Sequence, residues 1–212
     1  KELVAKADEA TKKSGERFFK QNEQVKMYGV KTALVSSMAK NYFKTIKGKP
    51  KSNIFTLCEE LWHSDYIEEA FIACQWAYFL RKQFEPADFT LLNRWVNTYI
   101  SNCATCDTLC NHTVGDFIQM YPEFIEELKS WAVSPNRWVK RAAAVSLIVP
   151  ARRGKFLSEV FEIADILMLD SDDMVQKGYG WLLKVTSQVY QDQVYNYVIK
   201  HKSVMPRTAL RY

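Results

Sequence analysis

The sequence has little glycine and little proline, with seven and six residues of these types among 212. So few turn-forming residues disfavour a loop-rich all-β fold and favour long helices. The sequence also lacks any apolar run of about 18 residues, so it predicts no transmembrane helix. Its charged start does not resemble a signal peptide. We therefore expect a protein of the cytoplasm with no membrane contact.

The common short motifs of catalysis are missing as well. There is no P-loop, no GxGxxG, no HExxH and no recognisable Ser-His-Asp set. The five cysteines are an odd number, which is typical of reduced thiols in a cytoplasm. Cys103, Cys106 and Cys110 share one helical face near His112, but their spacing matches no common zinc template. Cysteine also packs well as a small apolar residue, so we predict no metal and no cofactor.

Apolar residues recur with helical periodicity through almost the whole sequence, and no segment alternates long enough to predict a strand. Proline, glycine and capping residues mark the breaks between helices. The predicted helices span residues 2–13, 14–21, 30–46, 52–62, 65–82, 86–100, 103–120, 121–133, 136–149, 155–168, 172–190, 191–201 and 205–212. The sequence therefore predicts an all-α protein.

A weak repeat relates some of these helices. The window 138–142 returns 36 residues later at 174–178 as a large apolar residue, valine, a polar residue, a cation and a small residue. Its size pattern is also found at 66–70, with the charge inverted. A two-helix period of this length is typical of a HEAT-like α-solenoid. We expect one domain over residues 1–212, a curved superhelix of about six antiparallel helix pairs.

The positive charge is concentrated near the end of the sequence. Residues 137–212 hold 12 Lys/Arg and 7 Asp/Glu, a difference that equals the whole net charge of +5. Lys177, Trp181 and Lys184 follow one helical stripe, and an indole between two cations suits a nucleic-acid backbone with a sugar or base contact. The alternative is that Trp181 lies in the core, as tryptophan usually does. Gly178 and Gly180 closely precede Trp181 and indicate that the backbone of this helix lies close to another group.

Asp107 lies in the middle of a predicted helix, on the same side as Cys103 four residues earlier. A carboxylate there is either solvated or a partner of the basic residues. A salt bridge from Asp107 to Arg141 in the neighbouring repeat is feasible. Beside cations, such a carboxylate is able to stabilise a developing positive charge or to orient a water molecule.

Four segments together resemble the DNA alkylation repair family of HEAT-like-repeat DNA glycosylases. They are MYGVKT at 27–32, ATCDTL at 104–109, NRWVKRAAAV at 136–145 and KGYGWLLKV at 177–185. The similarity covers nearly the whole sequence. It implies a monomeric, metal-free hydrolase that releases N3- and N7-alkylated purines from double-stranded DNA bound on a concave, basic face.

The resemblance also implies roles for single residues. Asp107 matches the catalytic carboxylate, Arg141 the arginine that grips a phosphate near the lesion, and Trp181 an aromatic residue against the deoxyribose. We expect Lys140 to be a supporting charge. The remaining expected DNA contacts are Lys177, Lys184 and Arg207.

One position departs from the family pattern. Cys103 stands where the family has a second aromatic residue, four positions before the aspartate, and a thiol offers no π face. Cys103 is therefore a candidate cleft residue of altered function. Two other functions stay open: a relative that binds distorted or branched DNA without cutting it, and an α-solenoid scaffold for a protein partner.

Overall fold

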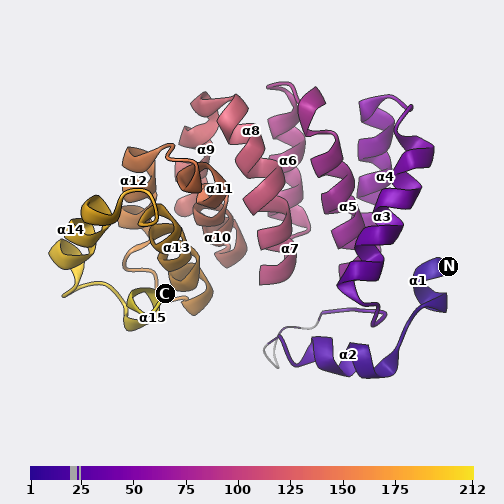
Figure 1. Cartoon of the computed structure of the whole chain (residues 1–212), viewed down its shortest axis with the longest axis horizontal. Coiled ribbons are helices and arrows are strands. Elements are labelled where there is room, and N and C mark those ends of the chain that lie inside the picture. Colours follow the sequence, from indigo (N-terminus) through magenta and orange to yellow (C-terminus); the bar gives the residue numbers. More distant parts are fainter. Residues whose placement is uncertain (20–22, 24) are drawn as a thin grey trace. The chain divides into compact units, whose positions relative to one another are not determined.

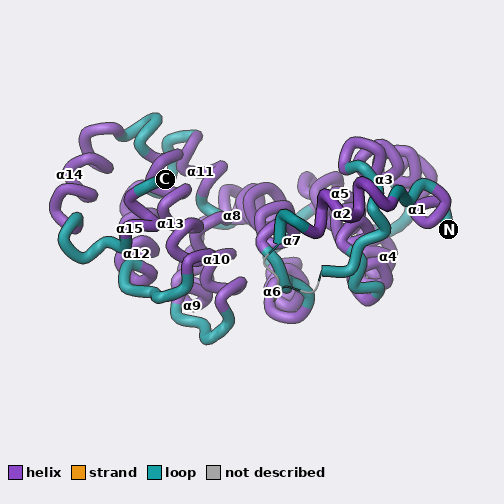
Figure 2. The backbone as a smooth tube through the Cα atoms, turned by 90° about the horizontal axis from the view of Figure 1, so that it is seen from below, coloured by secondary structure: helices purple, strands orange, loops and turns teal. Residues whose placement is uncertain are grey.

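The computed structural model describes residues 1–19, 23 and 25–212, and these residues form helices connected by loops (Figure 1). Figure 2 draws helices and loops and no strand among the described residues. Within these ranges, the one isolated β-bridge joins Lys26 and Tyr66. None of the described helices is long and apolar enough to cross a bilayer. The predicted fold class, an all-α protein of the α-solenoid type, is confirmed.

The helices fall into two compact units, residues 1–84 and 85–212. The predicted single domain over 1–212 stays a prediction. The first unit contains α1 (Glu2–Ala5), α2 (Glu9–Glu16), α3 (Thr32–Ile46), α4 (Lys51–His63), α5 (Ile67–Phe79) and the short 3₁₀ helix η1 (Arg81–Gln83). Helix α5 packs against both α3 and α4. The buried Trp76 indole of α5 donates a 2.9 Å hydrogen bond to the Ala39 carbonyl of α3.

The second unit holds the remaining helices. They are α6 (Asp88–Thr98), α7 (Cys103–Thr108), the π-helix η2 (Leu109–Val114), α8 (Gly115–Met120), the 3₁₀ helix η3 (Pro122–Phe124), α9 (Ile125–Ala132), α10 (Arg137–Val145), α11 (Ile148–Arg152), α12 (Leu157–Leu167), α13 (Asp173–Thr186), α14 (Gln191–His201) and α15 (Arg207–Leu210). Helix α10 packs against α7, α9 and α13. The windows 138–142 and 174–178 of the predicted repeat thus lie on two helices in direct contact.

The predicted helix over 2–13 is wrong as one element. It ends at Ala5 and resumes at Glu9, because the Asp8 carboxylate accepts a 2.7 Å hydrogen bond from the Thr11 amide and caps a new helix. Residues 14–16 continue this second helix, and residues 17–19 are not helical. The separate helix predicted over 14–21 is therefore not formed in the part that the structure describes. Residues 20 and 21 of that prediction lie outside the described residues.

Two longer predictions hold in part. Residues 103–120 are helical throughout, but a π-helical turn interrupts the α-helix between α7 and α8. The predicted helix 136–149 divides into α10 and α11. Asn136 caps α10 by accepting a 2.9 Å hydrogen bond from the Trp138 amide. The small residues Ala142, Ala143 and Ala144 are fully buried, which lets neighbouring helices approach α10 closely.

A buried carboxylate organises the segment that precedes α3. Glu68 is 3% exposed and accepts hydrogen bonds from the backbone amides of Tyr28, Gly29 and Val30 at 3.1, 2.8 and 3.0 Å. Gly29 has φ of +88°, and a Cβ there would lie 2.5 Å from the Asp8 carbonyl oxygen. Three of the six residues of MYGVKT are therefore held by one side chain of α5.

Both glycines of α13 allow a close approach, as the sequence predicted, but the approaching groups belong to the protein itself. A Cβ at Gly178 would lie 3.4 Å from the Arg141 Cγ atom. A Cβ at Gly180 would lie 2.9 Å from the carbonyl oxygen and 3.1 Å from the Cα atom of Ala209. Gly178 thus makes room for a side chain of α10, and Gly180 for the backbone of α15.

Replacing Gly180 with alanine is expected to displace α15. The new methyl group meets backbone atoms, which cannot rotate away as a side chain would, so we expect a loss of about 1–3 kcal/mol in the free energy of unfolding. Thermal unfolding and hydrogen exchange of the α15 amides measure the effect. Gly48→Ala is the matched control, because no heavy atom beyond the adjacent residues lies within 4 Å of the added Cβ. Equal stability of the two variants would contradict the assigned packing.

Candidate functional site

The side chains of Asp107 and Arg141 meet between α7 and α10. Arg141 donates from Nε to Asp107 Oδ1 and from Nη2 to Asp107 Oδ2, both at 2.8 Å. This two-pronged geometry fixes the plane of the carboxylate as well as its position. The salt bridge considered feasible from the sequence is present.

Arg141 is itself held from the other side. Its Nη1 donates a 2.7 Å hydrogen bond to the Met174 carbonyl in the first turn of α13, and its side chain lies against Gly178. The residue is only 5% exposed. Burial disfavours the charged guanidinium, but hydrogen bonding to Asp107 and its negative charge outweigh this effect and raise the pKa of Arg141 further. The arginine therefore stays charged, and three of its five N–H groups bind groups of the protein.

Asp107 keeps access to solvent, with 27% of its side chain exposed. Its helix is fixed by Asn102, whose side chain accepts a 2.9 Å hydrogen bond from the Thr105 amide. The two carboxylate oxygens provide about four lone-pair sites, of which Arg141 uses two. The carboxylate is thus oriented by a buried cation and still able to face a ligand or a water molecule.

The cysteines beside Asp107 pack in the protein interior. Cys103, Cys106 and Cys110 are buried and free of disulfides. The Cys106 thiol donates a 3.6 Å hydrogen bond to the Trp138 carbonyl, and burial raises its pKa well above the ordinary value. Among the described residues, no group of three or more His, Cys, Asp or Glu side chains is arranged to hold a metal ion.

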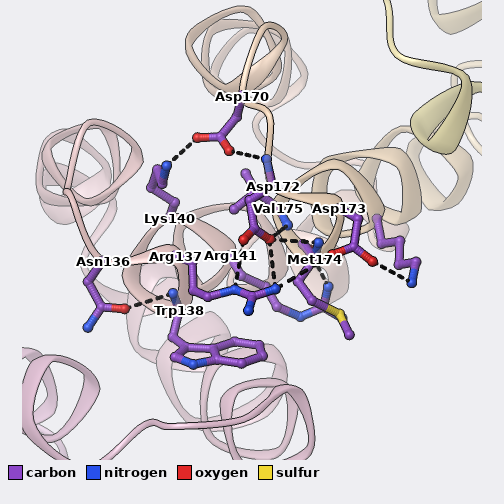
Figure 3. A network of polar contacts seen from close by, with 11 residues as sticks. Asn136, Arg137, Trp138, Lys140, Arg141, Asp170, Asp172, Asp173, Met174 and Val175 are labelled. Carbon is purple, nitrogen blue, oxygen red and sulfur yellow. Dashed lines mark hydrogen bonds and ion pairs between the residues drawn. The ribbon is translucent and has the colours of Figure 1, made fainter. Parts of the chain in front are cut away.

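Ion pairs join α10 to the segment that begins α13, and one further pair lies within α13 (Figure 3). Lys140 pairs with Asp170, and Lys177 pairs with Asp173 at 3.1 Å. Arg137 lies over the Trp138 ring and contacts Asp172 at 2.8 Å.

Asp172 has two roles: it caps α13 and it pairs with Arg137. Asp172 Oδ1 accepts hydrogen bonds from the Met174 and Val175 amides at 2.8 and 3.3 Å while its carboxylate also binds Arg137. The Met174 carbonyl then accepts from Arg141. The spacing of opposite charges could have predicted these ion pairs from the sequence. Acidic residues at 170, 172 and 173 follow the basic residues of α10 by about one repeat.

Trp181 lies one turn after Gly178 on α13 and is half-buried, so it is neither a core residue nor fully exposed. Lys184 is exposed one further turn along, with its Nζ atom 5.9 Å from the centroid of the Tyr212 ring. Arg207 is exposed at the start of α15. Arg141 therefore links Asp107 to α13 at the Met174 carbonyl and at Gly178, which precede Trp181 by two turns and one turn.

The sequence matches the family described as DNA alkylation repair enzyme over residues 1–212. Its fold is similar to the solved structure of a protein described as a predicted DNA alkylation repair enzyme from Enterococcus faecalis. The TM-score is 0.86 at 14% sequence identity, over 97% of this chain and 94% of that chain. No curated protein matches the sequence significantly.

Proposed function

We propose that this chain, which belongs to the family of DNA alkylation repair enzymes, hydrolyses the N-glycosidic bond of positively charged N3- and N7-alkylated purines in duplex DNA. Family membership supports a role in DNA repair. The glycosylase reaction is our proposal, supported by the resemblance of the four motif segments and by the Asp107–Arg141 pair. We further propose that the protein acts as a monomer, without a metal or cofactor. The cytoplasmic location also stays a prediction.

The reaction needs few catalytic groups, which suits a site built around one carboxylate, Asp107, and the arginine that binds it. A cationic purine is already a good leaving group, so the bond to the sugar breaks as positive charge develops on the deoxyribose. A carboxylate near that sugar stabilises the oxocarbenium character and orients the attacking water, whose proton it accepts. The water oxygen forms the new bond to the anomeric carbon, and the departing base takes the bonding electrons. No protonation of the base is required, because its positive charge is neutralised as it leaves.

The observation that carries the proposal is the orientation of Asp107 by buried Arg141. A carboxylate fixed before the substrate binds needs little reorganisation as charge develops. We propose that holding Asp107 is the principal role of Arg141, and that a phosphate contact uses the two N–H groups that the protein leaves available. Trp181 is proposed to lie against the deoxyribose, since contact with an aromatic face does not depend on the base sequence of the DNA.

The test is release of free base from duplex DNA that carries N3- and N7-methylated purines. The protein in excess over DNA should give free methylated base in a single turnover, measured by chromatography, and abasic sites in equal number. Undamaged duplex is the matched control and should release none. Absence of release from DNA shown to be bound would contradict the proposed reaction.

A second function, binding of damaged or distorted DNA without cutting, is favoured by Cys103. This residue is 9% exposed and gives no aromatic surface beside Asp107. A binder would show salt-dependent affinity for DNA but no free base even after long incubation. The same assay therefore separates the two functions.

A further inference from the structure

The cations of the second unit divide into two groups. The first group forms ion pairs with acidic residues of the protein: Arg137, Lys140, Arg141, Arg153 and Lys177, together with Lys129. The second group, which includes Lys184, Arg207 and Arg211, is exposed and forms no ion pair among the described residues. Three members of the second group, Lys184, Arg207 and Arg211, lie near the end of α13 and on or directly after α15, whereas Lys140, Arg141 and Lys177 lie on α10 and in the first turns of α13.

Members of the second group gather where α15 lies on α13. Gly180 allows the Ala209 backbone to approach within about van der Waals distance, and the start of the Tyr212 side chain lies on the same glycine. The Tyr212 ring then lies below the Lys184 ammonium. Arg207 and Arg211 are four residues apart at the two ends of this short helix, and the Arg211 amide donates a 3.2 Å hydrogen bond to the Arg207 carbonyl. Arg207 and Arg211 are thus exposed and one helical turn apart, on the element that lies against α13 next to Lys184.

Pairing decides which cations attract a phosphate. A carboxylate close to a lysine nitrogen cancels much of its field at longer range, so Lys140 and Lys177 offer little net charge to a nucleic-acid strand. Moving such a lysine to a phosphate also breaks an existing contact. An unpaired arginine has neither disadvantage, and its planar fork matches two phosphate oxygens.

We propose that Lys184, Arg207 and Arg211 form a contact surface for the backbone phosphates of DNA, beginning one turn beyond Trp181 on α13. This inference rests on the proposed function and makes it more specific, because it assigns phosphate binding to the α13–α15 surface. Lys140 and Lys177, expected from the sequence to bind DNA, are instead structural partners of Asp170 and Asp173. Tyr212 supports the surface by holding Lys184 over its ring.

The experiment compares two double variants that remove the same charge. Arg207→Gln with Arg211→Gln is expected to lower affinity for a short undamaged duplex at least ten-fold at about 0.1 M salt, and to reduce the slope of log K against log salt by about two. Lys140→Gln with Lys177→Gln is expected to leave the slope unchanged. Circular dichroism confirms folding of both proteins, and Arg207→Lys with Arg211→Lys should restore most of the slope.

The outcomes separate this inference from the proposed function. If the slope falls only in the Lys140 and Lys177 variant, the α13–α15 surface is wrong, whereas the glycosylase stands if wild-type protein releases base. If the slope falls as proposed but no base is released, the surface stands and the reaction fails. Wild-type protein that binds no duplex at low salt would overturn both.

Discussion

Replacing Asp107 with asparagine is expected to lower the single-turnover rate of base release by about 100-fold or more, while the duplex is still bound. The amide carries no negative charge, so it stabilises positive charge on the sugar much less and cannot accept a proton from water. Phosphate contacts elsewhere do not involve this residue, so affinity should change little. Rates with saturating protein and affinities by fluorescence anisotropy measure the two effects separately.

The control must account for Arg141, which loses its charged partner in this variant. One oxygen of asparagine still accepts a hydrogen bond, but its NH₂ group faces a donor of the buried guanidinium. Some loss of stability is therefore expected. Asp116→Asn is the matched control, because it also removes a carboxylate that pairs with an arginine. Asp116 lies on the neighbouring helix α8 and pairs with Arg153. It should keep most of the activity. An Asp107 variant with undiminished release would show that the assigned chemistry is wrong.

Helical periodicity predicted most of the architecture because apolar residues recur along the buried face of each helix. Packing of that face supplies most of the stability of a helix in a protein. Helices α3, α4, α13 and α14 begin and end within a few residues of the predicted bounds. The repeat between 138–142 and 174–178 also corresponds to real packing of α10 on α13. Such a match arises because each repeat packs against the next one in the same way, so equivalent positions need small residues.

Partner choice was harder to predict, because it depends on distances between segments far apart in the sequence. Lys140, Arg141 and Lys177 lie in the two matching repeat windows of the sequence, whereas the structure pairs each with a different aspartate. The π-helical turn after α7 was also not predicted, because its six residues are too few to show a period of their own. The sequence singled out Asp107 by its place in a predicted helix and by the family resemblance, whereas its orientation by Arg141 follows only from the structure.

Replacing Glu68 with alanine is expected to lower the free energy of unfolding of the first unit by about 3 kcal/mol or more. Three backbone amides lose their shared acceptor, and each unsatisfied buried donor costs about 1–3 kcal/mol, less where water enters. The negative charge also lies in the first turn of α5, where the helix dipole favours it. Hydrogen exchange of the Tyr28, Gly29 and Val30 amides in the full chain measures the loss locally, and thermal unfolding measures it globally.

Two variants make this test specific to the carboxylate. Glu68→Gln keeps one oxygen for Gly29 and Val30 and loses the acceptor of the Tyr28 amide, so its effect should be intermediate. Glu69→Ala removes the neighbouring carboxylate, which accepts only the Tyr28 hydroxyl at 2.8 Å, and should cost about 1 kcal/mol or less. A loss of stability that decreases in the order Glu68→Ala, Glu68→Gln, Glu69→Ala identifies Glu68 as the residue that holds this segment. Equal protection of the three amides in all variants would mean that packing around Gly29, not the carboxylate, fixes it.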